Sequence, residues 1–155
     1  MNLVTASDLM RRDLAAVMQD EPVRLVMSFL HRRSLSGVPV VDEHWRLKGF
    51  FSQSDIIRLV MPTPFELLGQ ESFLFDDQRA LLRRFAHLAD RPVCEFMKTD
   101  PLYVERHTPL MDIADLFVHR KIRRLPVVEE GVLVGTVGQD DVLDYLERHF
   151  NDEEA

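Results

Sequence analysis

The chain has 155 residues, of which 46% are apolar and 29% charged, and with 6 Gly and 8 Pro this composition is that of a globular protein rather than a disordered one. Nineteen Lys and Arg against 26 Asp and Glu leave a net charge of −7, so no overall field attracts nucleic acid or anionic lipid. The single Cys94 excludes an intramolecular disulfide, and neither an apolar signal core nor a membrane-spanning run is present. We therefore expect a cytoplasmic protein that binds no nucleic acid and no membrane.

An internal repeat organises the chain. A shift of 87 positions superimposes Met10 on Met97, Asp13 on Asp100, Pro22 on Pro109, and 39–41 on 126–128. After one deleted residue the shift becomes 86, and it superimposes Gly49, Gln53 and Asp55 on Gly135, Gln139 and Asp141. The deletion falls between 42 and 49, where a hairpin connection tolerates it. The sequence therefore predicts two copies of one structural unit.

Repeat 1 predicts the order strand, helix, strand, strand, helix. A short strand around 16–17 precedes Pro22, a residue suited to the first position of a helix. The following apolar residues have the i, i+3, i+4, i+7 spacing of an amphipathic helix: Val23, Val26, Met27 and Leu30. Segments 38–41 and 45–51 are expected to form two strands of a hairpin, and a polar turn at 52–54 opens a last helix over 55–60.

Residues 61–92 are too long for a simple linker. Pro62 and Pro64 stop the preceding helix, and Asp76 is a candidate cap for a further helix with Leu81, Phe85 and Leu88 on one face. This face, together with other apolar residues of the insert, either covers the core or links the two halves, or else it forms a partner or dimer surface: Phe65, Leu67, Phe73 and Phe75.

Repeat 2 predicts the same order of elements. A strand at 102–104 is followed by Thr108 as a candidate N-cap and by Pro109 at the first helical position. The apolar helix face then comprises Leu110, Ile113, Ala114 and Phe117. Strands at 125–128 and 132–137 lead into a helix over 141–150, and the acidic end 152–154 is expected to be a frayed, solvated tail.

The ordered set of motifs resembles the cystathionine β-synthase (CBS) domain. Its pieces in repeat 1 are 10–13, 38–42 and 49–55, and in repeat 2 they are 97–100, 125–129 and 135–141, so the match covers about 6–60 and 93–150. The resemblance implies an α+β fold, an α/β sandwich of two βαββα repeats packed about a pseudo-twofold axis, usually as a dimer. The implied organisation is repeat 1 at 1–60, a helical insert at 61–92, repeat 2 at 93–150 and a tail at 151–155.

The resemblance also implies a function. Pairs of this kind often bind an adenosine-containing ligand, namely AMP, ADP, ATP or S-adenosylmethionine, in clefts between the repeats. Most relatives are attached to an enzyme, channel or transporter, whereas this chain resembles the stand-alone form. We therefore expect a regulatory, energy-sensing homodimer that needs no cofactor and signals ligand occupancy to an unidentified protein.

The family pattern Gly-x-x-(Ser/Thr)-x-x-Asp supplies candidate ligand-binding residues. Gly49, Ser52 and Asp55 satisfy it, and a carboxylate at a helix start either accepts hydrogen bonds from both ribose hydroxyls or merely caps its helix. Repeat 2 keeps the glycine and Asp141, but Gly138 replaces the hydroxyl and Asp140 adds a charge. Both changes should weaken phosphate binding there, leaving the Asp141 site empty or selective for a less anionic ligand.

The basic cluster at 119–124 has two interpretations. It is either a solvated helix end or a phosphate site made by Arg123 or Arg124, at positions where nucleotide-binding relatives carry basic residues. In the second case we expect one shared ligand, with its ribose on Asp55 and its phosphate on an arginine of the other repeat. The resemblance places adenine in an apolar slot whose candidate residues could equally be ordinary core: Val17, Val38, Pro39, Val104, Leu125 and Pro126.

An enzymatic function is not expected. The sequence has no His-x-x-x-His, His-Glu-x-x-His or Cys-x-x-Cys spacing, no phosphate-binding Walker loop and no Gly-x-Gly-x-x-Gly, so we predict neither catalytic nor metal-ligating residues. One alternative remains open, a dimeric scaffold or interaction adaptor that binds no nucleotide. Nucleic-acid binding would depend on the 119–124 cluster alone.

Overall fold

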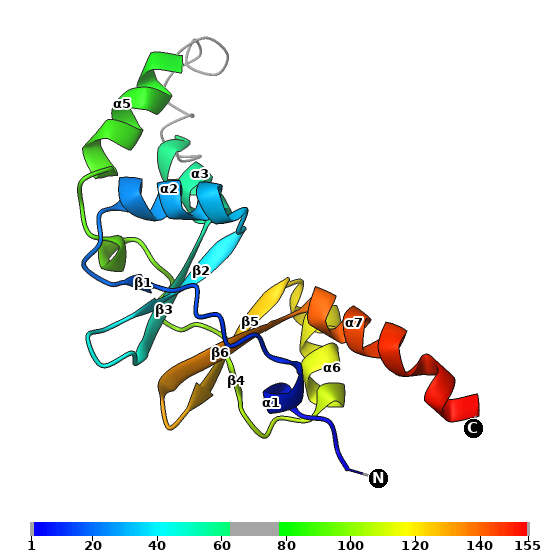
Figure 1. Cartoon of the computed structure of the whole chain (residues 1–155). Coiled ribbons are helices and arrows are strands. Elements are labelled where there is room, and N and C mark those ends of the chain that lie inside the picture. Colours follow the sequence, from blue (N-terminus) through cyan, green and yellow to red (C-terminus); the bar gives the residue numbers. More distant parts are fainter. Residues whose placement is uncertain (1, 63–77, 155) are drawn as a thin grey trace. The chain divides into compact units, whose positions relative to one another are not determined.

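The structure, a computed structural model, describes residues 2–62 and 78–154 and has an α+β architecture (Figure 1). The predicted strand, helix, strand, strand, helix order is confirmed in both repeats. Repeat 1 comprises β1 (Val17–Met18), α2 (Val23–Arg33), β2 (Gly37–Val41), β3 (Leu47–Ser52) and α3 (Gln53–Val60). Repeat 2 comprises β4 (Val104–Glu105), α6 (Leu110–Arg120), β5 (Arg124–Glu129), β6 (Val132–Gly138) and α7 (Gln139–His149).

Further helical elements flank the repeats: α1 (Ala6–Leu9), α5 (Gln78–Leu88), η1 (Val93–Glu95) and η2 (Phe150–Glu154). The strands form two three-stranded sheets with the orders β1-β2-β3 and β4-β5-β6. Each sheet therefore uses the strands of one repeat.

The chain divides into two compact units whose borders differ from those of the repeats. The repeat-2 unit comprises 1–15, 41–47 and 101–155, and the repeat-1 unit comprises 16–40 and 48–100. The leading segment of each repeat, 1–15 in repeat 1 and 93–100 in repeat 2, which comes before the first strand of that repeat, thus belongs to the unit of the other repeat. The tip of the β2–β3 hairpin also belongs to the repeat-2 unit, where Leu133 N donates to Trp45 O at 2.9 Å.

In the repeat-2 unit, β4 pairs parallel to β5, and β5 pairs antiparallel to β6 with an irregularity between Val127 and Val128. The leading segment lies along β6, because Arg11 and the buried Thr136 exchange backbone hydrogen bonds of 2.8 and 3.1 Å. Fully or nearly fully buried side chains of α6 and the sheet form the core: Val104, Ile113, Leu125, Val127 and Val137.

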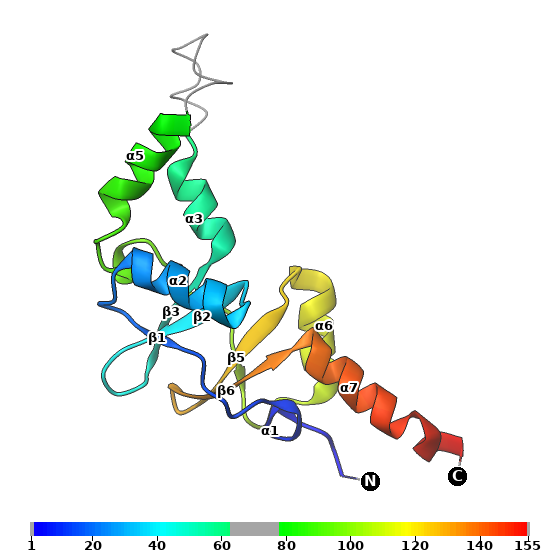
Figure 2. The same cartoon turned by 45° about the horizontal axis from the view of Figure 1, so that its top comes forward.

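The repeat-1 unit has the corresponding construction. The segment before repeat 2 pairs with β3, where Phe50 and Lys98 exchange backbone hydrogen bonds of 3.0 and 2.9 Å. The core is formed by buried side chains of β1, α2, β2, β3, α3 and η1: Val17, Val23, Val26, Leu30, Val38, Val40, Phe51, Ile56, Val60 and Val93, with Leu88 of α5. Figure 2 shows α5 running beside α3, and the two helices are in contact.

The insert is described in part. The helix expected to carry Leu81, Phe85 and Leu88 is present as α5, in which Leu88 is buried, Phe85 packs against the core and Leu81 is 41% exposed. The predictions for Pro64, Phe65, Leu67, Phe73, Phe75 and Asp76 fall outside the described residues. The described part of the insert therefore contributes to the core of the repeat-1 unit.

Several predicted helix ends were wrong by one or two residues. Pro22 and Pro109 are N-caps rather than first helical residues, and Thr108 instead accepts a hydrogen bond from Glu105 N at 3.0 Å through its Oγ1. Both last helices begin two residues earlier than predicted, with Ser52 and Gly138 as their N-caps. Pro22, Pro109 and Gly138 make no side-chain cap hydrogen bond, so no capping side chain marks these helix starts in the sequence.

The acidic end is helical where a frayed, solvated tail was expected, although Asn151 and Asp152 are exposed, as a solvated end requires. Residues 150–154 continue from α7 as a short 3₁₀ helix. Asp152 accepts a contact of 2.8 Å from the ring Nδ1 of His149, which ties the acidic end to the last turn of α7.

Candidate functional site

The motif of repeat 1 forms a reciprocal cap at the start of α3. Asp55 Oδ2 accepts hydrogen bonds from Ser52 N at 2.9 Å and Ser52 Oγ at 3.0 Å, while Asp55 N donates to Ser52 Oγ at 3.3 Å. Asp55 is buried, and its Oδ1 is 3.2 Å from Arg58 Nη1. This arrangement fixes the carboxylate through Oδ2 and directs Oδ1 toward a side chain that is 69% exposed.

Gly49 and Gly135 serve a purpose that the motif alone did not reveal. A Cβ on Gly49 would lie 2.5 Å from Met97 Sδ and 2.6 Å from Lys98 O, and a Cβ on Gly135 would lie 2.8 Å from both Met10 Sδ and Arg11 O. Each glycine is therefore needed where the segment preceding the other repeat crosses the strand.

Gln53 and Gln139, one in each repeat, anchor the last helix to the loop before the second strand. Gln53 Nε2 donates to Leu35 O at 3.1 Å, and Gln139 Nε2 donates to Ile122 O at 2.8 Å. The recurrence of glutamine at the same position in both repeats was visible in the sequence, but it did not indicate what the side chain does.

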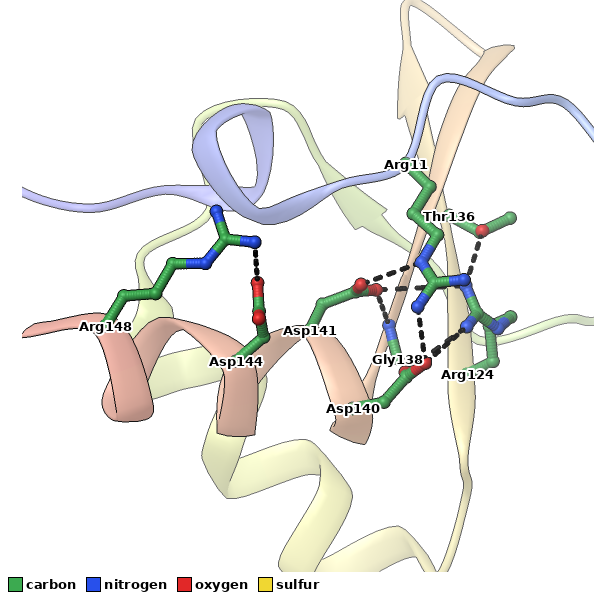
Figure 3. Close-up of polar contacts among 8 residues, drawn as sticks. All are labelled: Arg11, Arg124, Thr136, Gly138, Asp140, Asp141, Asp144 and Arg148. Carbon is green, nitrogen blue, oxygen red and sulfur yellow. Dashed lines mark hydrogen bonds and ion pairs between the residues drawn. The ribbon is translucent and has the colours of Figure 1, made fainter.

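The motif of repeat 2 carries a network of charged side chains at the start of α7 (Figure 3). Asp141 Oδ2 accepts from Gly138 N at 2.8 Å, and its Oδ1 accepts from Arg11 Nε at 2.9 Å. Arg124 Nη1 donates to Thr136 Oγ1 at 2.9 Å and lies 3.8 Å from Asp141 Oδ2. All of these residues belong to the repeat-2 unit.

Arg11 was missed by sequence reasoning because it lies 130 residues from Asp141 in the chain. The hydrogen bond to Asp141 raises the pKa of Arg11 above its ordinary value, and the charges of Asp141 and Asp140 raise it further. The guanidinium is therefore positively charged throughout the usable pH range.

The remaining predicted site residues are Arg123 and the candidates for the adenine slot. Arg123 is exposed, and its carbonyl accepts from Gln139 N at 3.1 Å. The candidate adenine-slot residues are all buried: Val17, Val38 and Pro39 in the repeat-1 unit, and Val104, Leu125 and Pro126 in the repeat-2 unit. Asp55 and Arg124 belong to different units, so their sharing of one ligand stays a prediction.

Within residues 2–62 and 78–154, no group of three or more His, Cys, Asp or Glu side chains is arranged to hold a metal ion. The same described part of the chain contains no helix with the length and apolar character to span a bilayer.

Two βαββα repeats, each with an aspartate in the first turn of its last helix, place this chain in the class of tandem-repeat α+β proteins. The chain belongs to the CBS domain family, whose family model matches it twice, at 6–62 and 93–148. The family predicted from the motifs is thereby confirmed.

Similar proteins include an uncharacterised protein of Methanocaldococcus jannaschii, 27% identical over 93% of this chain and 92% of its own length. The chloroplastic CBS domain-containing protein CBSX2 of Arabidopsis thaliana is 30% identical, and the match covers 90% of this chain but 62% of that protein. A crystal structure of CBSX2 in complex with AMP superimposes with a TM-score of 0.71, at 28% identity, and the match covers 93% of this chain and 96% of that one.

Proposed function

We propose that this protein is a non-catalytic, cytoplasmic regulatory module that binds an adenosine-containing ligand and signals its occupancy to a partner protein. The candidate ligands are AMP, ADP, ATP and S-adenosylmethionine. Membership of the CBS family and the similarity to a protein solved with AMP support the ligand class.

The observation that carries the proposal is the geometry of Asp55. Its Oδ2 is held by the backbone and hydroxyl of Ser52, so the carboxylate is fixed before any ligand arrives. Its Oδ1 contacts the exposed side chain of Arg58, and a carboxylate oxygen can accept further hydrogen bonds. A ribose hydroxyl could therefore bind Oδ1 without dismantling the helix cap.

The proposed mechanism is a population shift. A ligand that contacts both repeats favours the arrangement in which its ribose and phosphate contacts are correctly spaced. It can change the equilibrium only by its difference in affinity for the two arrangements. A partner that binds one arrangement better than the other would then detect the ligand.

Isothermal titration of the full chain with each of the four ligands tests the proposal. We expect Asp55→Asn to weaken binding by about 10- to 100-fold, because a hydrogen bond to a charged group contributes about 1.5–3 kcal/mol. The asparagine retains an acceptor for Ser52 N, so circular dichroism should show an unchanged fold. The matched Asp141→Asn should weaken binding less. An absence of both heat and thermal shift with all four ligands would refute the proposal.

A dimeric scaffold that binds no nucleotide is the second candidate, and one surface favours it. Leu143 and Leu146 on α7 and Phe150, the first residue of η2, follow one another at spacings of three and four and are 64%, 52% and 65% exposed. Ile57, the equivalent of Leu143 in repeat 1, is 62% exposed on α3. Apolar helix faces of this kind fit a homodimer contact, which we propose for either function.

A further inference from the structure

The feature that the proposed function leaves unexplained is Asp140. Figure 3 shows its carboxylate between two guanidinium groups. Arg11 Nη2 donates to Asp140 Oδ2 at 2.7 Å, and Arg124 Nη2 donates to Asp140 Oδ1 at 3.2 Å and Oδ2 at 3.4 Å. One carboxylate therefore satisfies donors from two arginines that come from distant parts of the sequence.

The two aspartates of this network differ in how firmly they are held. The side chain of Asp141 is 9% exposed, and its Oδ2 accepts from the backbone of Gly138. The side chain of Asp140 is 56% exposed, and its hydrogen bonds come from the guanidinium groups of Arg11 and Arg124. An anion arriving from solvent could therefore replace the Asp140 carboxylate while Asp141 stays in place.

Gly138 provides the space that the Asp140 carboxylate occupies. A Cβ at position 138 would fall on Asp140 Oδ1, and it would lie 2.9 Å from Arg124 Nη2. A side chain at position 138 would therefore displace the Asp140 carboxylate, so the absence of the motif hydroxyl leaves the space that this carboxylate fills.

Repeat 1 lacks this arrangement. Its residues at the positions of Gly138 and Asp140 are Ser52 and Ser54, and Gly37 stands at the position of Arg124. Lys98, at the position of Arg11, is the one cation among these counterparts. The network is thus specific to repeat 2.

We propose that Arg11 and Arg124 form a receptor for a phosphoryl group and that the Asp140 carboxylate occupies it until an anionic ligand displaces it. Two guanidinium groups that already share one pair of oxygens have the geometry that suits phosphate oxygens. The charges of Asp140 and Asp141 formally balance those of the two arginines, so the receptor is neutral when no ligand is bound. Asp140 thereby sets the affinity and the charge selectivity of this half of the protein.

Asp140 does more in this proposal than repel phosphate. As an isolated charge it would weaken phosphate binding only through repulsion, whereas as a partner of both arginines it also occupies the donors that a phosphoryl group would need. Its replacement should therefore strengthen anion binding by more than the removal of a nearby charge does. Only the adenosine part of the ligand rests on the proposed function, because the anion exchange needs the arginines alone.

Titration of inorganic pyrophosphate, ATP and adenosine into the full chain tests the inference. The variant is Asp140→Ser, which installs the residue found at this position in repeat 1. We expect about tenfold tighter binding of pyrophosphate and ATP, since a charge-assisted contact at a partly exposed site contributes a modest amount. The affinity for uncharged adenosine should be unchanged. Adding Arg11→Ala should remove the gain.

The matched control is Asp144→Ser, which removes the same charge from the same helix. Asp144 forms its ion pair with Arg148 at 3.1 Å (Figure 3), and its charge raises the pKa of Arg11 less than the charges of Asp141 and Asp140 do. The inference is overturned if Asp140→Ser improves pyrophosphate binding no more than Asp144→Ser does. It is also overturned if neither the unsubstituted protein nor the Asp140→Ser variant binds pyrophosphate. If Asp140→Ser gains affinity for pyrophosphate but the protein binds none of the four adenosine ligands, the result would refute the proposed function and support the receptor.

Discussion

Gly49 offers a direct test of how the segment before repeat 2 is held in the repeat-1 unit. An alanine Cβ at this position would lie 2.6 Å from Lys98 O, and this carbonyl accepts a hydrogen bond from Phe50 N at 3.0 Å. Lys98 N donates in return to Phe50 O at 2.9 Å. The added methyl must therefore push apart two chain segments that are joined by a pair of hydrogen bonds.

The magnitude follows from three contributions. Overpacking of a well-packed site costs about 1–3 kcal/mol. Weakening of the two hydrogen bonds costs up to about 1 kcal/mol each. The lower conformational entropy of alanine in the unfolded chain offsets about 0.4–1 kcal/mol. Taken at their middle values, these contributions lower the free energy of unfolding of Gly49→Ala by about 2 kcal/mol, and at their extremes by at most about 5 kcal/mol.

Urea unfolding followed by circular dichroism measures this change. Ser54→Ala, at an exposed position of α3, is the control and should change the unfolding free energy by less than about 0.5 kcal/mol. Gly135→Ala should cost less than Gly49→Ala, because its closest contacts are at 2.8 Å rather than 2.5 Å. An unfolding free energy for Gly49→Ala within error of the unsubstituted protein would refute the reasoning.

Two further predictions concern the core and the surface. Ile113→Ala should lower the unfolding free energy by about 2–5 kcal/mol in urea, because Ile113 is fully buried, whereas Met111→Ala on the same helix should change it little. An equal loss for both variants would contradict the assigned core. Leu146→Asp should convert a dimer into a folded monomer in sedimentation velocity experiments, because Leu146 lies half exposed on α7. A dimer that persists would show that this helix face is not the contact.

The order of the elements was predictable from the sequence for a local reason. Apolar residues at helical spacing, such as Val23, Val26 and Leu30, became the buried face of α2, and the apolar run 125–128 became the buried part of β5. These patterns arise from the period of each element and need no information about distant residues. The internal repeat then doubled the information, because each copy supported the assignment of the other.

The candidate site was predictable only in part. The positions of Asp55 and Asp141 at helix starts followed from the motif. The partners of Asp141 did not, because Arg11 reaches it across the whole length of the chain. The position of the Asp140 carboxylate in the space beside Gly138 was also not predictable, because it depends on distances in the folded chain.

The location of 1–15 and 93–100 in each other's units has a consequence for the ancestry of the fold. In a protein with a single repeat, the sheet edge would have to pair with the leading segment of a second molecule. Duplication within one gene places the sheet and the pairing segment in one chain, so completion of each half no longer depends on protein concentration. For the same reason, neither half should be separable by cutting the chain at its repeat border.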